Sequence, residues 1–135
     1  MRRTSELIPY RFINGQYYLF VQKRSKDPPP SPHMYGMFGG GIEEGETPEA
    51  ALFREVREEL DYHPRDVIFF RRYEYSDYEL NVFLSKVDEC FESEITVLEG
   101  EYGTFLNEAE LRVVNVSEMD RTVFNDVLRW LKASD

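Results

Sequence analysis

Alternating and mainly apolar stretches along the chain predict two pairs of β-strands. The first pair is joined by Asn14-Gly15, a dipeptide typical of two-residue hairpin turns. The second pair is rich in aromatic and β-branched residues, which favour strands, and it turns near Ser76-Asp77. The predicted strands span residues 6–12, 16–23, 67–75 and 78–87.

Helical periodicity predicts a helix at residues 48–60 and another at residues 121–132. The first has no Gly or Pro in its interior, Thr47 can cap it, and Pro48 fits its first position. Asn107 can cap a short third helix through Leu111. The predicted buried positions are Leu52, Val56 and Leu60 in the first helix and Val123, Phe124, Val127, Leu128 and Leu131 in the last. The segment 25–35 contains four prolines and is expected to be an exposed loop.

The composition of the chain indicates one globular domain spanning residues 1–135, with 41% hydrophobic and 15% aromatic residues. The 16 basic and 26 acidic residues give a net charge of −10, which argues against binding to a nucleic-acid polymer or an anionic membrane. Cys90 is the single cysteine, and the sequence shows neither a membrane-length apolar run nor a signal peptide. We therefore expect a cytoplasmic protein, either a monomer or a homodimer.

Three glutamates of the first helix lie where they weaken it. Carboxylates stabilise the N-terminal end of a helix and destabilise the C-terminal end, yet Glu55, Glu58 and Glu59 all fall in the second half. Glu55 and Glu59 are also one turn apart and repel each other. Such violations indicate a functional site, and carboxylates beside a glycine-rich loop suit a hard cation such as Mg²⁺. On charge alone, a solvated acidic helix face explains these residues equally well.

The spacing of these residues favours the functional interpretation, because it resembles the Nudix box. That motif reads Gly, any five residues, Glu, any seven, then Arg-Glu-apolar-any-Glu-Glu-any-Gly-apolar. The matching residues here are Gly40, Glu46, Arg54, Glu55, Val56, Glu58, Glu59 and Tyr62. Asp61 stands where the family has Gly, at a position expected to need a left-handed backbone, and Asp is one of the few residues tolerated there.

The resemblance implies a fold, a reaction and a metal site. The fold is a Nudix-type α/β/α sandwich with a mixed central sheet, and the reaction is hydrolysis that depends on Mg²⁺ or Mn²⁺. The segment after the box resembles MutT-like members, in which a Glu beside a Gly lies over the metal, and Glu99 matches that Glu. The implied metal ligands are Gly40, Glu55, Glu58, Glu59 and Glu99, and the implied catalytic residues are Glu58, Glu59 and Glu99.

Further residues are expected to bind substrate or to support the box. Arg24 ends a predicted strand and matches an Arg that contacts substrate phosphate in the family, and Gly41 lets the backbone approach the phosphates. Tyr78 and Asp120 are also substrate-binding candidates, although Tyr78 is equally typical of an ordinary sheet residue. The remaining box residues, Glu46 and Arg54, are expected to brace the loop and the helix.

The expected substrate is a small nucleotide. Length and the Glu99-Gly100 segment favour a MutT-like enzyme that converts a ribo- or deoxyribonucleoside triphosphate to the monophosphate and pyrophosphate. Hydrolysis of diadenosine polyphosphates, nucleotide sugars or ADP-ribose is the alternative. Tyr78 weakly matches the first of these, and the proline typical of ADP-ribose enzymes is absent. Another alternative is a nucleotide-binding module without catalysis, but such modules typically lose box glutamates that are all present here.

Overall fold

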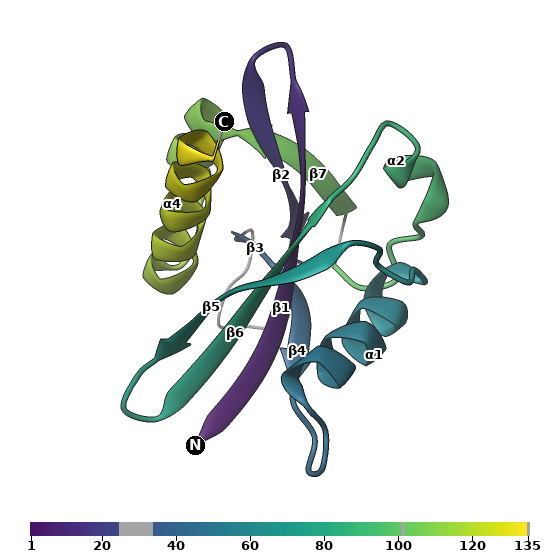
Figure 1. The fold of residues 1–135 in the computed structure, drawn as a ribbon, viewed down its shortest axis with the longest axis vertical. Helices are drawn as coiled ribbons and strands as arrows, with labels where there is room; N and C mark the ends of the chain where they lie inside the picture. Colours follow the sequence, from purple (N-terminus) through teal and green to yellow (C-terminus); the bar gives the residue numbers. More distant parts are fainter. Residues whose placement is uncertain (25–33, 101, 135) are drawn as a thin grey trace.

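The computed structural model describes residues 1–24, 34–100 and 102–134, which build a mixed sheet of seven strands (Figure 1). Five strands follow the order β3-β2-β1-β6-β5, while β4 pairs with β1 and β7 pairs with β2. The parallel pair is β1–β6, and the other pairings named here are antiparallel. The bounds are β1 Arg2–Ile13, β2 Gln16–Lys23, β3 Tyr35–Gly36, β4 Phe38–Gly41, β5 Val67–Glu74, β6 Tyr78–Lys86 and β7 Tyr102–Asn107.

Helices cover both faces of this sheet. They are α1 Pro48–Leu60, α2 Phe91–Glu94, α3 Glu108–Val113 and α4 Glu118–Ala133. Figure 1 shows α1 and α4 on opposite sides of the strands, which is the layer order expected for an α/β/α sandwich. Among the described residues, no helix is both long and apolar enough to cross a membrane.

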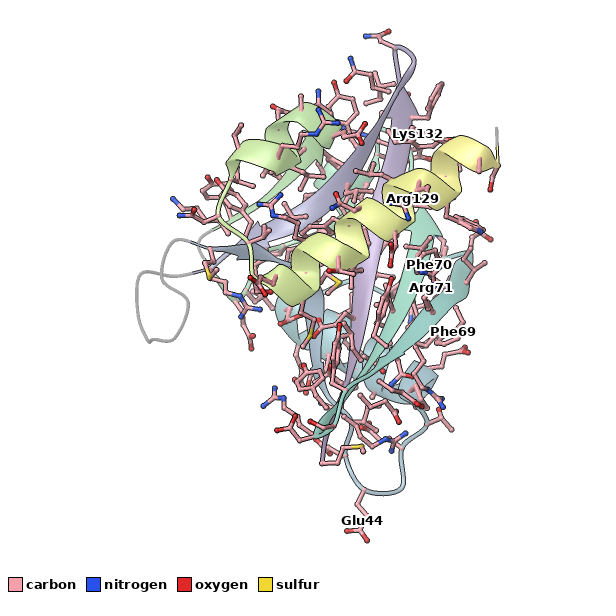
Figure 2. The ribbon with its side chains drawn as sticks, turned by 90° about the vertical axis from the view of Figure 1, so that its left-hand side faces the viewer. Glu44, Phe69, Phe70, Arg71, Arg129 and Lys132 are labelled. Carbon is pink, nitrogen blue, oxygen red and sulfur yellow. The ribbon has the colours of Figure 1, made fainter. Side chains whose placement is uncertain are left out.

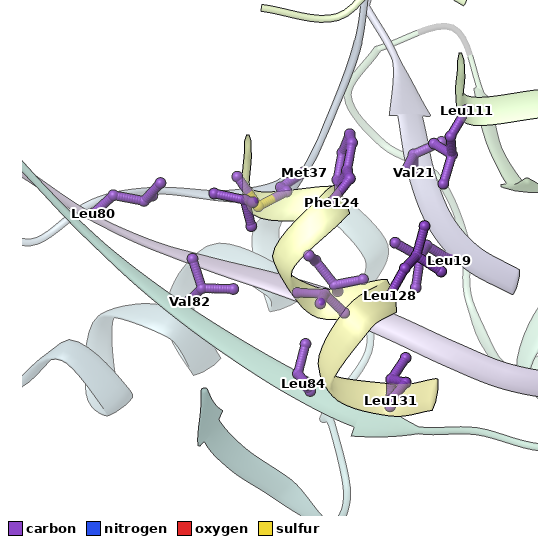
Figure 3. Packing of buried hydrophobic residues seen from close by; sticks show 13 residues of the cluster. Leu19, Val21, Met37, Leu80, Val82, Leu84, Leu111, Phe124, Leu128 and Leu131 are labelled. Carbon is purple, nitrogen blue, oxygen red and sulfur yellow. The ribbon is translucent and has the colours of Figure 1, made fainter. Parts of the chain in front are cut away.

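The alternation of side chains along the strands divides the core into two clusters. On β1, Ile8 belongs to the cluster beneath α4, whereas its neighbour Leu7 belongs to the cluster beneath α1. Figure 3 shows the α4 cluster, in which the helix lays its apolar side chains across β2 and β6. The five positions predicted to be buried on α4 and the three on α1 are all buried. Truncation of one such leucine to alanine costs about 2–5 kcal/mol of stability.

The first helix has the bounds that the sequence predicts. The Thr47 Oγ1 accepts a hydrogen bond of 3.1 Å from the Ala50 N–H, and Pro48 occupies the first helical position. Asp61 ends the helix with φ 48° and ψ 47°, and its N–H donates to the Arg57 carbonyl at 3.0 Å. The prediction of a left-handed residue at position 61 is therefore confirmed.

Other boundaries differ from the predictions because long-range contacts set them. β1 begins at Arg2 rather than at residue 6, since it pairs with β6 from Arg2 onward and with β4 from Thr4 to Leu7. α4 begins three residues earlier than predicted, at Glu118, because the Ser117 Oγ caps it. The short α2 was not predicted. Residues 25–33 of the proline-rich segment lie outside the described residues. The predicted loop is wrong at its end, because Tyr35 in β3 pairs with Lys23.

The backbone at Asp61 leads to a stability prediction. Asp61→Gly should stabilise the protein by about 0.5 kcal/mol, because glycine adopts the left-handed conformation without a Cβ penalty. The measurement is the free energy of unfolding in urea. Asp77→Gly is the matched control, because Asp77 is also exposed but lacks a positive φ, and this change should destabilise instead. A less stable Asp61→Gly variant would show that the Asp61 side chain makes a stabilising contact.

Candidate active site

Arg54 on α1 holds the loop before the helix against the helix itself. Its guanidinium donates two hydrogen bonds to the Glu46 carboxylate, at 2.8 and 2.9 Å, and one to the Gly41 carbonyl at 2.9 Å. The Glu46 carboxylate also accepts from the Glu43 N–H at 2.8 Å. These hydrogen bonds lower the pKa of Glu46 to about 2, and the bond from Arg54 has the largest effect. The side chains of Arg54 and Glu46 are thus bonded within the protein, and they connect the loop to α1.

Two glycines of β4 permit close contacts that a side chain would block. The Gly39 N–H donates to the Glu59 Oε1 at 2.6 Å, and Gly39 has φ 146°, in the region that favours glycine. A Cβ on Gly40 would lie 2.5 Å from the carboxyl carbon of Glu55. Gly41 differs, because a Cβ there would project into open space. The structure therefore shows no steric need for glycine at Gly41.

Burial and mutual repulsion dominate the electrostatics of the helix glutamates. Glu59 is only 5% exposed, and burial raises its pKa to about 8. The Gly39 N–H lowers this pKa, and the nearby carboxylates Glu99 and Glu55 raise it. Glu58 differs from Glu59, since its side chain is 53% exposed and lies 3.5 Å from Arg54. The structure thus places Glu55 and Glu99 near enough to Glu59 to act on its charge, and it leaves Glu58 more exposed.

Glu99 reaches the box because its segment is bonded to the end of α1. The Thr96 and Leu98 N–H groups donate to the Leu60 and Glu59 carbonyls at 2.8 and 2.7 Å, so the segment also satisfies terminal carbonyls of the helix. The Glu99 carbonyl accepts from the Gln22 Nε2 at 3.1 Å. Gln22 was not singled out from the sequence, where nothing distinguishes it from any other polar strand residue.

A second set of polar side chains, from Arg24 and Asp120, lies around Gly36 on the face of the sheet that α4 covers, here called the α4 face. A Cβ on Gly36 would lie 3.1 Å from the Asp120 Oδ2 and 3.2 Å from the Arg24 Nη2, so the structure brings these two predicted residues together. Burial raises the pKa of Asp120, and the Arg24 charge partly opposes this shift. Tyr78 also faces α4, where its ring packs on the cluster and its hydroxyl is hydrogen-bonded to the Thr4 Oγ1 at 3.0 Å.

Glu6 is an acidic group of this region that the sequence analysis missed. It lies opposite Gly39 in the β1–β4 pairing, and its Oε2 would meet a Cβ placed on Gly39. Burial raises the pKa of Glu6 well above its usual range, and the charges of Asp120 and Glu59 add to the shift. The sequence holds a signal for Glu6. It lies two residues before Ile8 and therefore shares its strand face, where an acid is unusual among mainly buried residues.

A comparison with protein families identifies the family of the chain. A family model described as the NUDIX domain matches residues 8–131, which is most of the chain. The chain belongs to the Nudix hydrolase family. The prediction made from the box residues is therefore confirmed.

Two curated proteins are similar to this Nudix hydrolase in sequence. The nucleoside triphosphatase NudI of Enterobacter sp. (strain 638) is 43% identical over 60 residues, which cover 44% of this chain and only 41% of that protein. The 8-oxo-dGTP diphosphatase of Escherichia coli (strain K12) is 32% identical over 99 residues, or 70% of this chain and 73% of that protein.

Solved Nudix structures share the fold. A structure from work on MutT of Aliivibrio salmonicida and Vibrio cholerae superposes with a TM-score of 0.77 at 20% identity, covering 96% of this chain and 98% of that one. The NUDIX domain of Shewanella oneidensis NrtR, complexed with ADP ribose, gives a TM-score of 0.78 at 12% identity, covering 96% and 87%. The predicted α/β sandwich is thus confirmed. Nudix hydrolases generally use a divalent metal ion and act on small nucleotides.

The donors around Glu59 fit a divalent cation by their chemistry. Carboxylate and carbonyl oxygens are the ligands that hard cations prefer, and a buried carboxylate such as Glu59 needs a positive charge nearby to remain ionised. Across residues 1–24, 34–100 and 102–134, however, no three acidic, His or Cys side chains lie close enough together to hold an ion. Arg54 accounts for part of this separation of the carboxylates. It lies 2.9 Å from Glu55 and 3.5 Å from Glu58, and its charge attracts both.

Glu59 should make the metal-free protein less stable as the pH rises. Its folded-state pKa of about 8 exceeds the ordinary 4.5, so the folded state holds a proton that the unfolded state has lost. In EDTA, the free energy of unfolding should therefore fall between about pH 5 and about pH 8 in the wild type, and Glu59→Gln should lack this part of the decrease. Denaturant unfolding at several pH values measures it.

Glu58→Gln is the control for this experiment. Glu58 lies on the same helix and loses the same charge, but its side chain is half exposed. Its stability should therefore follow that of the wild type across the pH range. If both substitutions change the pH dependence of the free energy of unfolding equally, the loss of a negative charge on α1, and not the burial of Glu59, sets this dependence.

Proposed function

We propose that this Nudix hydrolase cleaves the diphosphate linkage of nucleoside triphosphates, ribo or deoxy, to give the monophosphate and pyrophosphate. The observation that carries this proposal is the position of Glu55 and Glu59 against the glycines of β4, with Glu99 near enough to act on Glu59. The names of the two curated relatives, a nucleoside triphosphatase and an 8-oxo-dGTP diphosphatase, support the same substrate class.

We assign the metal site to the box and to the segment after β6. Glu55, Glu58, Glu59 and Glu99, with the Gly40 carbonyl, would hold Mg²⁺ or Mn²⁺. The bound ion supplies positive charge that offsets the phosphate charges and lowers the pKa of a bound water. This role agrees with the net negative charge of the chain, because the local positive charge need not come from basic side chains.

The protein groups position the carboxylates for the reaction. The Gly39 N–H holds one oxygen of Glu59, Arg54 holds Glu55, and the contacts of Gln22 and of the α1 terminus hold the Glu99 segment. A water oxygen bonds to phosphorus while the bridging P–O bond breaks and pyrophosphate leaves. One of Glu58, Glu59 and Glu99 accepts the proton of the water.

The residues on the α4 face complete the substrate site in this proposal. Arg24, Tyr78 and Asp120 contact the nucleotide, and Gly41 leaves open space beside the loop for the phosphates. Asp120 and the Arg24 guanidinium both lie beside Gly36, and their opposite charges attract each other.

Product analysis tests the reaction and its metal requirement. Incubation with Mg²⁺ and a panel of nucleoside triphosphates, diadenosine polyphosphates, nucleotide sugars and ADP-ribose should give monophosphate and pyrophosphate from the triphosphates. Excess EDTA should abolish turnover, and added Mg²⁺ or Mn²⁺ should restore it. Turnover that persists in EDTA would reject the metal assignment, and preferential cleavage of another substrate class would reject the triphosphate assignment.

The role of Glu99 can be tested separately. Glu99→Gln should lower kcat at least tenfold, or about 1.4 kcal/mol of activation free energy, because it removes one of the grouped carboxylates. Glu44→Gln is the charge-matched control, since Glu44 is exposed at the tip of the loop that projects from the molecule (Figure 2). That variant should keep wild-type kcat. Equal losses in the two variants would exclude a specific role for Glu99.

A further inference from the structure

Gln22 is a polar residue in the interior of the sheet. It lies on β2 between Gly36 of β3 and Gly103 of β7, and it is only 5% exposed. Side chains alternate along a strand, so Gln22 shares the face of Phe20, which belongs to the cluster beneath α1. A buried amide lowers stability unless it is hydrogen-bonded. The partner of this side chain therefore indicates what the residue does.

The side chain of Gln22 reaches across the sequence to the segment that carries Glu99. Its Nε2 donates a hydrogen bond of 3.1 Å to the Glu99 carbonyl. The next residue, Gly100, also lies against β2. It has φ 80°, and a Cβ on it would lie 3.0 Å from the Gln22 Nε2 and 2.9 Å from the Lys23 carbonyl oxygen. The chain thus turns tightly over the end of β2 directly after Glu99.

Two attachments, one on each side, hold the backbone at Glu99. Toward α1, the Leu98 N–H donates to the Glu59 carbonyl at 2.7 Å. Toward β2, the Gln22 amide holds the carbonyl of Glu99 itself. Glu99 is an exposed residue, so packing restrains its side chain little, and the direction of its carboxylate depends on the backbone. Loss of the Gln22 donor would leave only the attachment to α1.

A contribution to stability alone does not account for Gln22. An apolar side chain of similar length would fill the same interior position without the cost of desolvating an amide. Such a side chain could not hold the Glu99 carbonyl. A buried polar residue that breaks the local pattern of a strand indicates a functional requirement. The contact of Gln22 places that requirement at Glu99.

We propose that Gln22 is a positioning residue that acts on the reaction through Glu99. It touches neither the nucleotide nor the metal. Its amide holds the backbone of Glu99 so that the carboxylate stays near Glu59 and can take part in the metal site. This inference rests on the proposed role of Glu99 in hydrolysis, and it adds the interior residue that fixes Glu99 in place.

A double-mutant cycle tests whether Gln22 acts through Glu99. Gln22→Met keeps the length of the side chain but removes the donor, and it should lower kcat at least fivefold while changing KM less than twofold. In the Glu99→Gln background, the same substitution should change kcat less than twofold, because the residue through which it acts has already lost its carboxylate. The assay uses saturating Mg²⁺ and the nucleotide that the wild type hydrolyses fastest.

Amide hydrogen exchange in EDTA provides a measurement that needs neither metal nor turnover. The Leu98 N–H should exchange at least fivefold faster in Gln22→Met than in the wild type, because the segment has lost one of its two attachments. The Ala51 N–H, which donates to the Thr47 carbonyl in the first turn of α1, is the internal reference. Its exchange rate should stay that of the wild type.

Gln16→Met is the matched control. Gln16 is an exposed residue at the opposite end of β2, where its Oε1 accepts a hydrogen bond of 3.0 Å from the Asn107 Nδ2. The substitution thus removes a hydrogen-bonded glutamine from the same strand, and it should leave kcat and the Leu98 exchange rate unchanged. Gln22→Glu, which has the same size but lacks the NH₂ donor, takes the place of Gln22→Met if that variant fails to fold.

Two results would overturn the inference. Equal losses of kcat from Gln22→Met in the two backgrounds would show that Gln22 acts independently of Glu99. An unchanged Leu98 exchange rate would show that Gln22 does not hold the segment. If Glu99→Gln alone leaves kcat unchanged, the proposed role of Glu99 fails, and the effect of Gln22 on catalysis fails with it. Hydrogen exchange then decides separately whether Gln22 holds the segment.

Discussion

The concentration of carboxylates at one end of the sheet is the constraint on which the rest of the site depends. Glu55 and Glu59 repel each other along α1, and Glu99 adds to the repulsion across the fold. Arg54 is the main compensating charge, since it binds Glu46 and Glu55 and also the Gly41 carbonyl. Its forked guanidinium makes these contacts at once, which the single ammonium of a lysine cannot do.

The hydrophobic core fixes the glutamates of α1 in position, although their repulsion lowers the stability of the helix. Leu52, Val56 and Leu60 anchor α1 beneath the sheet, so the glutamates between them cannot turn away from the glycines of β4. Burial raises the pKa of Glu59 to about 8, so ionising this carboxyl group in the folded metal-free protein is unfavourable at neutral pH. In the proposed metal site, a bound cation would favour the ionised form of Glu59 and would stabilise the folded protein.

Different polar side chains lie on the two sides of the sheet. On one side of the sheet, α1 carries the carboxylates of the box, and on the other side Asp120 of α4 lies near Arg24. Gly39 joins the two groups, because its lack of a side chain lets carboxylates approach it from both faces.

The sequence alone determined the features that depend on local rules. Thr47 and Pro48 set the start of α1, the periodicity of apolar residues set its buried face, and the spacing of the box glutamates identified the family. Even the left-handed backbone at Asp61 followed from its position after the helix. These features need no partner distant in the chain, so pattern and propensity suffice to predict them.

Only the tertiary structure decided which residues meet. The early start of β1, the contact of Glu99 with Glu59 and the closeness of Arg24 to Asp120 arise from pairings between distant segments. The sequence shows Glu6 only as an acid on a mainly apolar strand face, and its position opposite Gly39 follows from the pairing of β1 with β4. Hydrogen bonds between strands, and close packing around glycines, create these contacts, and neither leaves a local pattern in the sequence.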